Sequence, residues 1–160
     1  MKKRESILVS ACLLGAATRY DGQSIVKLDL QNVKDKYNFI PFCPEVYGGL
    51  PTPRTPSERV GDRVLMKNGE DVTENFRRGA EEAYRLCLLF ECKIAVLKEK
   101  SPSCGKGQIY DGSFSGRLTE GDGYTTEYLT SRGIRVLGES EFLSMIEHGG
   151  ALSKLLKKGQ

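Results

Sequence analysis

Four short apolar runs divide this chain and constrain its fold more than any other feature. Residues 7–10, 39–42, 94–97 and 134–137 are rich in β-branched or aromatic side chains. Runs of this length and composition predict buried β-strands. Pro41 lies inside the second run, and because proline has no amide hydrogen to donate within a sheet, we expect that strand to be brief or to lie at an edge.

A long helical pattern lies between the second and third runs. Across residues 73–92 the apolar side chains recur with the spacing of one helix face, and Thr73 is expected to cap the start. The face expected to be buried consists of Phe76, Ala80, Ala83, Tyr84, Cys87 and Leu88. The face expected to meet water carries Glu81, Glu82 and Arg85.

Two further helices are predicted towards the end of the sequence. One begins near Thr125 or Thr126 and stops at Gly133, a residue type that tolerates the left-handed backbone of a helix end. The other covers residues 140–148, and a basic turn is expected over residues 152–158.

Strands that alternate with helices predict parallel strands joined by right-handed crossovers. We therefore expect a three-layer, Rossmann-like α/β fold, in which a short, mostly parallel sheet is flanked by helices. A length of 160 residues suits one domain, so residues 1–160 are expected to form a single α/β domain. Residues 43–61 are dense in Pro and Gly and are expected to form a functional loop without regular structure.

Composition narrows the class of protein. A net charge of +3 is too small to indicate a nucleic-acid partner and better suits a small polar or anionic substrate. No stretch approaches the roughly 20 apolar residues of a membrane span, and the apolar run before Cys12 is too short for a lipoprotein signal. An odd count of five cysteines is a poor disulfide framework. We expect a cytoplasmic protein whose thiols bind metal or react.

Three of the cysteines follow predicted strands. Cys12 falls two residues beyond the first strand, Cys43 directly after the second, and Cys104 in the turn after the third. The carboxyl ends of parallel strands meet at one edge of a sheet, where such folds bind ligands. These thiols are therefore predicted to form a metal site, whereas Cys87 and Cys92 lie on the long helix and are interpreted as core or surface filling.

The kind of metal follows only in part from the residues. Three thiolates can hold a tetrahedral zinc ion with an open position, or a four-iron cluster with one iron free of protein ligands. The single histidine, His148, lies near the chain end, which argues against a mixed Cys/His zinc site. No C-x-x-C pair occurs, which removes the zinc-ribbon and thioredoxin-like interpretations. An open iron is a Lewis acid suited to a sulfur-bearing substrate.

Polar residues surround the three cysteines along the sequence. Glu45 can act as a general acid or base, or simply bond to loop backbone. Lys98 ends the third strand and can bind substrate, extend to solvent or pair with a carboxylate. Arg54, Ser101 and Ser103 complete this candidate set.

Two Tyr-Asp-Gly segments, residues 20–22 and 110–112, predict turns in which Asp accepts a backbone hydrogen bond and Gly adopts positive φ. Asp21 is kept as a candidate substrate-binding residue. The glycine-rich segments 105–107 and 121–123 match neither phosphate-loop nor dinucleotide spacing, so no nucleotide cofactor is expected.

Together these motifs resemble a family of domains of unknown function that includes the thiouracil desulfidases. The resemblance runs from about residue 7 to residue 139. It is carried by residues 10–15, 19–22, 42–54, 71–73, 97–105 and 109–112. The second domain of the family's larger members has no counterpart here, so functions that need it are not expected.

The resemblance implies an iron–sulfur enzyme that removes sulfur from a thiolated pyrimidine such as 2-thiouracil, without oxidation or reduction. It implies a four-iron cluster held by the cysteines that match Cys12, Cys43 and Cys104, with the open iron binding the substrate sulfur. Glu45 is then the expected proton shuttle, and Ser101 orients substrate or water.

Lys98, Ser103, Asp21 and Arg54 are the residues expected to bind substrate. The expected partner is a small thio-compound, with neither nucleic acid nor membrane, and the chain is expected to be a monomer or weak homo-oligomer. Other interpretations remain open: a desulfidase for another thio-compound, a sulfur carrier, or a non-catalytic metal-binding regulatory module.

Overall fold

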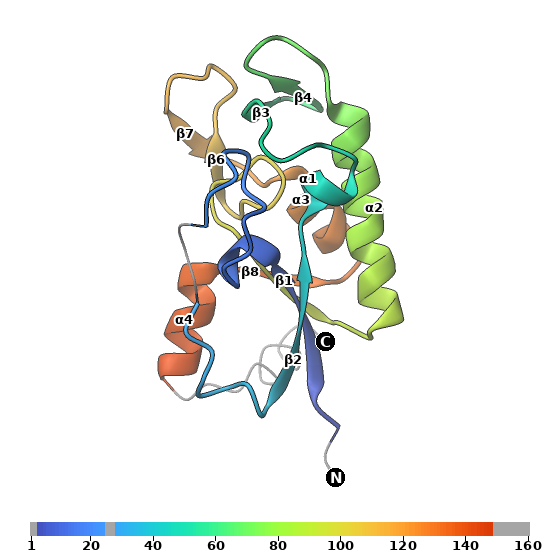
Figure 1. The fold of residues 1–160 in the computed structure, drawn as a ribbon, viewed down its shortest axis with the longest axis vertical. Coiled ribbons are helices and arrows are strands. Elements are labelled where there is room, and N and C mark those ends of the chain that lie inside the picture. The colour runs from blue at the N-terminus through green and yellow to red at the C-terminus, as the bar shows by residue number, and fades with distance from the viewer. Residues whose placement is uncertain (1–2, 25–27, 149–160) are drawn as a thin grey trace.

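The central sheet has four parallel strands in the computed structural model, which describes residues 3–24 and 28–148 (Figure 1). These strands are β1 (Glu5–Ser10), β2 (Tyr37–Phe42), β5 (Ile94–Leu97) and β8 (Arg135–Gly138), in the order β2-β1-β5-β8. All three pairings are parallel. The four predicted strands are confirmed, with β8 displaced by one residue, and β2 lies at an edge as Pro41 requires.

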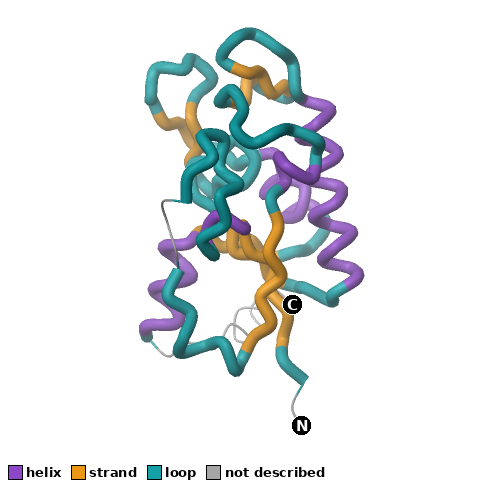
Figure 2. The backbone as a smooth tube through the Cα atoms, viewed as in Figure 1, coloured by secondary structure: helices purple, strands orange, loops and turns teal. Residues whose placement is uncertain are grey.

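The remaining elements are helices and two antiparallel hairpins (Figure 2). A 3-10 turn, Ala11–Leu13, follows β1, and the helices are α1 (Pro44–Tyr47), α2 (Thr73–Leu89), α3 (Tyr124–Ser131) and α4 (Glu139–Glu147). The hairpins are β3 (Ser57–Val60) with β4 (Arg63–Met66), and β6 (Gln108–Tyr110) with β7 (Leu118–Glu120). No helix in the described ranges is long and apolar enough to cross a membrane.

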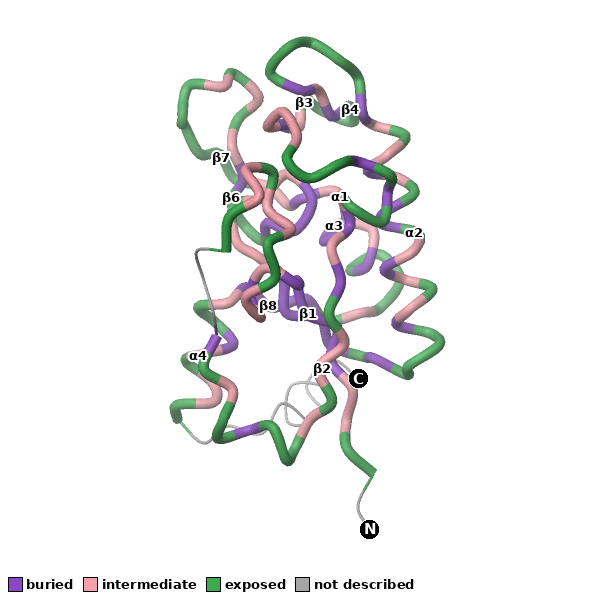
Figure 3. The backbone as a smooth tube through the Cα atoms, viewed as in Figure 1, coloured by how far each residue is buried: buried purple, intermediate pink, exposed green. Residues whose placement is uncertain are grey.

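Alternate residues of β1 pack against opposite layers. Leu8 belongs to an apolar cluster with Ala83 of α2 and Leu129 of α3. Ile7 belongs to a second cluster with Phe142 of α4. Because neighbouring side chains of a strand point to opposite faces, both faces of β1 are buried, as Figure 3 shows. This arrangement confirms the expected three-layer α/β fold.

The prediction that residues 43–61 lack regular structure is wrong. Pro44 begins α1, because a proline in the first turn of a helix gives up an amide that has no partner within the helix. Further on, Ser57–Val60 forms β3 and pairs with β4. Both hairpins escaped prediction because their short strands mix polar with apolar residues instead of forming the apolar runs that mark the central sheet.

The predicted helix starts also need correction. Val72, not Thr73, occupies the N-cap of α2, and the Asp71 carboxylate accepts the Thr73 amide hydrogen at 2.9 Å. Gly123 occupies the N-cap of α3, so Thr125 and Thr126 lie inside that helix and are buried. Short polar residues favour the N-cap, but here Val72 and Gly123 occupy it, and the Asp71 carboxylate accepts the first amide hydrogen of α2.

At the helix ends, one prediction is confirmed and one is wrong. Gly133 adopts φ +84° just beyond α3, as expected of a glycine that stops a helix. Leu88 was expected on the buried face of α2 but is 62% exposed, because α2 ends at the next residue and extends past the helices it packs against. The predicted basic turn at 152–158 lies outside the described residues.

The carboxyl ends of the parallel strands point towards the two hairpins, which occupy the top of Figure 1. The first and third parallel strands in the sequence, β1 and β5, are neighbours, and the second, β2, lies on the other side of β1. The chain therefore reverses its direction of winding between β1 and β5. Folds of this kind bind ligands at that reversal, beyond the strand ends.

Two glycines bring α1 and α2 into backbone contact. A Cβ placed on Gly79 of α2 would lie 2.0 Å from the Pro44 carbonyl oxygen, and one on Gly48 would lie 2.1 Å from the Asn75 carbonyl oxygen. The side-chain amide of Asn75 also donates to the Gly48 carbonyl oxygen at 2.9 Å. Since Pro44 follows Cys43, this contact fixes the position of that cysteine relative to α2.

Gly79→Ala is expected to lower the free energy of unfolding by about 1–3 kcal/mol, because its methyl group has no room beside Pro44. Alanine ordinarily stabilises a helix by about 1 kcal/mol relative to glycine. A decrease in the free energy of unfolding, rather than an increase, would therefore show the backbone contact. The measurement is urea unfolding of the metal-free protein. Arg78→Ala, at the exposed neighbouring position, is the control. A Gly79→Ala protein more stable than wild type would contradict the contact.

Candidate metal and substrate site

A cavity of about 460 Å³ lies beyond the carboxyl ends of β1, β2 and β5. Cys12, Cys43 and Cys104 all border it, together with residues of the β3–β4 hairpin and of the loop after β6. Its volume is in the range of small-molecule sites. The structure thus brings the three predicted thiols to one cavity at the predicted edge of the sheet.

Each thiol comes from a different connection. Cys12 lies in the 3-10 turn after β1, Cys43 is the N-cap of α1, and Cys104 lies in the loop after β5. The backbone of Cys104 is fixed on both sides, because its amide donates to Ser101 Oγ at 3.1 Å and its carbonyl accepts from Thr126 Oγ1 at 2.8 Å.

Hydroxyl or carbonyl oxygens contact the sulfur atoms of Cys104 and Cys43. Ser10 Oγ donates to Cys104 Sγ at 3.5 Å and accepts the Lys98 amide hydrogen at 2.9 Å, so it joins the ends of β1 and β5. The Cys43 thiol donates to the Thr18 carbonyl at 3.8 Å. Thr18 Oγ1 is buried and has no partner among the described residues. The Ser10 hydroxyl, a donor to Cys104 Sγ, therefore suits an anionic sulfur at that position.

Burial makes these thiols reluctant to ionise. Burial, followed by the nearby Cys43, raises the pKa of Cys12 to about 11, against a smaller lowering by Lys98. Burial also raises the pKa of Cys104 to about 12 and, to a lesser extent, that of Cys43. Thiolates in contact with one another repel, so a bound cationic group is what favours ionisation of all three together.

The spacing of the donors bears on which metal group fits. Within residues 3–24 and 28–148, no group of three Cys, His, Asp or Glu side chains is arranged to hold a single metal ion. Tetrahedral zinc, with bonds of about 2.3 Å, would require sulfur atoms about 3.8 Å apart. A multi-iron cluster binds each cysteine to a different iron and spreads its ligands more widely. Cysteine thiols are also the donors that iron–sulfur clusters take.

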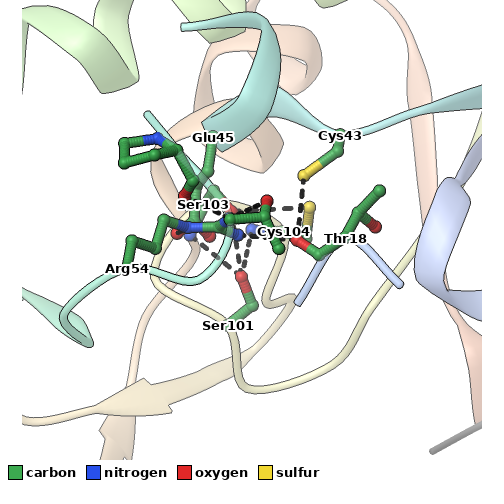
Figure 4. A network of polar contacts seen from close by, with 9 residues as sticks. Thr18, Cys43, Glu45, Arg54, Ser101, Ser103 and Cys104 are labelled. Atoms are coloured by element: carbon green, nitrogen blue, oxygen red, sulfur yellow. Dashed lines mark hydrogen bonds and ion pairs between the residues drawn. The ribbon is translucent and has the colours of Figure 1, made fainter. Parts of the chain in front are cut away.

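A buried ion pair lies beside the thiols (Figure 4). Arg54 Nε donates to Glu45 Oε1 at 3.1 Å, and their side chains are only 3% and 13% exposed. Arg54 also donates to the Thr18 carbonyl at 2.8 Å, the same oxygen that accepts the Cys43 thiol. Glu45 is thus bonded to side chains, rather than to loop backbone as one sequence interpretation allowed.

Two serines extend this network. Ser103 Oγ donates to Glu45 Oε2 at 2.8 Å and lies 2.9 Å from Ser101 Oγ. Ser101 Oγ accepts the amide hydrogens of Ser103 and Cys104, at 3.2 and 3.1 Å, which leaves its own hydrogen for the Ser103 hydroxyl. The hydroxyls form a line that leads to the carboxylate, as Figure 4 shows.

The last two candidates are placed differently. Lys98 borders the cavity, but its ammonium group donates to Glu139 at 2.8 Å and to the Glu99 carbonyl at 3.3 Å. Asp21 is not among the residues that line the cavity; its carboxylate accepts the Gln23 amide hydrogen at 3.0 Å, a contact that lowers the pKa of Asp21. The expected Asx turn is therefore present there.

Ser10, Thr18, Glu58 and Phe114 also line the cavity without having been singled out from the sequence. Ser10 had a usable signal, since it ends a predicted strand two residues before Cys12. Thr18, Glu58 and Phe114 had none, because their places depend on a loop and on hairpins that no pattern predicted.

Comparison with known proteins identifies the family of this chain. A family model described as 2-thiouracil desulfurase matches residues 7–141. The uncharacterized protein YbbK of Bacillus subtilis (strain 168) is 37% identical over 145 residues, which cover 84% of this chain and 96% of YbbK. The solved structure of the 4Fe–4S-dependent thiouracil desulfidase TudS matches with a TM-score of 0.82 and 48% identity, over 91% of this chain and 97% of TudS. The family resemblance noted in the sequence is confirmed: this chain belongs to the 2-thiouracil desulfurase family.

Proposed function

We propose that this protein is a desulfidase that removes sulfur from a thiolated nucleobase such as 2-thiouracil. In this proposal Cys12, Cys43 and Cys104 hold a four-iron cluster with one iron free of protein ligands. The observation that carries it is the convergence of three thiols with a carboxylate and a line of hydroxyls at one cavity. Family membership and the likeness to TudS, itself described as a thiouracil desulfidase, support the same activity.

When bound, a cluster with a free iron supplies a Lewis acid with affinity for the substrate's sulfur. The chemistry left to the chain is the movement of protons. Water adds to the thiocarbonyl carbon and the carbon–sulfur bond breaks, so 2-thiouracil and water give uracil and hydrogen sulfide. No electrons are gained or lost in this exchange.

Glu45 is the proposed proton carrier. Its carboxylate can accept a proton from the attacking water and return it to the departing sulfur. Arg54 holds one carboxylate oxygen and Ser103 the other, so the orientation of Glu45 is set before substrate enters. We propose that Ser101, at the end of the hydroxyl line, orients the water or the substrate.

The other candidates have supporting roles in this proposal. Ser103, Arg54 and Lys98 border the cavity and form its polar wall. Asp21 shapes the turn that follows Thr18. The five cysteines are all free, which suits a cytoplasmic location where thiols stay reduced and available to metal.

Replacing Cys12, Cys43 or Cys104 with alanine is expected to abolish cluster assembly, because each thiolate would bind a different iron. Iron and acid-labile sulfide are measured after anaerobic reconstitution, together with sulfide release from 2-thiouracil. Cys87→Ala, a change on the buried face of α2, should keep both. Equal iron loading of all four variants would rule out the three-cysteine site.

Glu45→Gln is expected to lower kcat for 2-thiouracil by about 10²–10⁴-fold, the usual effect of losing a positioned acid or base. The amide keeps the shape of the side chain but cannot carry a proton. Iron content should match wild type, which separates loss of chemistry from loss of the cluster. Glu141→Gln, an exposed carboxylate paired with Lys106, is the control. An unchanged kcat would remove Glu45 from the proposed mechanism.

Arg54→Met is expected to lower the free energy of unfolding by about 3 kcal/mol, because it leaves the buried Glu45 carboxylate without its cationic partner. In Glu45→Gln/Arg54→Met much of this loss should be recovered, since no unpaired charge remains. Arg63→Met, in an ion pair whose arginine is 65% exposed, should cost no more than about 1 kcal/mol. Additive single effects in the double variant would show that the pair is not coupled.

A further inference from the structure

Phe114 borders the same cavity as the three cysteines, yet packing does not explain its presence. It belongs to none of the three apolar clusters formed by the described residues, and it is only half-buried. Aromatic side chains in proteins usually pack within a core or against other rings. In the described part of the chain, no other aromatic ring pairs with Phe114. The ring is thus available to a molecule in the cavity.

The backbone of Phe114 is held in an unusual conformation. Its φ is +56°, in the left-handed region that bulky side chains rarely adopt. Conformations of this kind persist only where the surroundings impose them, and they cluster at ligand sites. Glycine or asparagine would adopt this conformation at lower cost than phenylalanine does.

Glu58 of β3, which also lines the cavity, holds the Phe114 backbone in this conformation. Its Oε1 accepts the amide hydrogens of Gly112 and Phe114, at 3.0 and 3.1 Å. Glu58 is only 9% exposed. Its two hydrogen bonds to the amides of Gly112 and Phe114 therefore hold this loop firmly. A Cβ on Gly112 would lie 2.7 Å from the Arg59 carbonyl oxygen, so the loop also presses directly on β3.

We propose that Phe114 is a specificity-determining residue that stacks on the planar ring of the thiolated pyrimidine, and that Glu58 is a positioning residue that holds Phe114 in place. The inference rests on the proposed function, since it assigns the site a flat aromatic substrate. Thiols and carboxylate act on one part of the substrate, while Phe114, from the loop after β6, holds its ring. A ring face offers stacking to any pyrimidine, whatever its substituents.

The test compares ligands that differ in flatness. 2-Thiouracil is planar, whereas 5,6-dihydro-2-thiouracil has the same thiocarbonyl group on a puckered ring. Wild type should prefer the planar compound in kcat/KM, and Phe114→Ala should lose about tenfold on it, mostly through KM, with little change on the puckered one. Phe114→Tyr keeps a ring and should retain the preference. Phe90→Ala, an exposed aromatic residue at the end of α2, is the control.

Calorimetric binding supplies a readout that does not depend on turnover. Uracil and 5,6-dihydrouracil are titrated into the reconstituted protein, and the difference in their affinities should shrink about tenfold in Phe114→Ala. If wild type binds uracil but releases no sulfide from 2-thiouracil, the proposed function fails while stacking is still measured. If Phe114→Ala keeps the full preference for planar rings, or if wild type shows none, the stacking inference is overturned.

The role of Glu58 is tested by rescue. Glu58→Gln retains an oxygen that accepts both amide hydrogens and should keep the preference for planar ligands. Glu58→Ala removes the acceptor and should weaken that preference about as much as Phe114→Ala. The double variant Glu58→Ala/Phe114→Ala should be no worse than Phe114→Ala alone, because Glu58 acts through the ring. Additive losses, or equal losses in Glu58→Gln and Glu58→Ala, would overturn the positioning role.

Discussion

The buried guanidinium of Arg54 is the interaction on which the site depends. This guanidinium donates to Glu45 at the start of α1 and to the carbonyl oxygens of Thr18 and Pro51. The backbone amide of Arg54 donates to the Tyr20 carbonyl oxygen. One side chain thereby holds together segments that precede and follow β2 in the sequence. A planar guanidinium with several fixed donors can do this, whereas the single ammonium of lysine cannot satisfy so many acceptors in one plane.

The electrostatic arrangement around Arg54 separates two tasks. Its charge is directed at Glu45, and Lys98 is directed at Glu139, so neither cation is paired with a thiol. The Cys104 sulfur is instead contacted by the Ser10 hydroxyl and the Cys43 thiol by the Thr18 carbonyl; Cys104 is buried, and Cys12 and Cys43 are partly buried. Ion pairs therefore fix the orientation of the carboxylates, and the sulfur atoms stay free to bind metal.

Much of this site was predictable because it follows from sheet topology. Cys12, Cys43 and Cys104 were identified because each follows an apolar run, and parallel strands bring such positions together. Glu45 and Ser101 were identifiable by their closeness to those cysteines in sequence. Glu58 and Phe114 were not, because their contact joins two hairpins whose strands are too short to show alternation. The N-caps of α2 and α3 were missed for another reason: Val72 and Gly123 occupy them, although threonine is the residue type that favours this position.

The attachment of each thiol to a different strand has a consequence for folding. Any group that binds Cys12, Cys43 and Cys104 together becomes a crosslink that closes two long loops of the chain. Closing such loops removes conformational freedom from the unfolded chain, as a disulfide does. A group bound only by the folded protein also stabilises it by mass action. Occupancy of the site and the free energy of unfolding are therefore linked. A chain that loses its bound group loses part of its stability against unfolding.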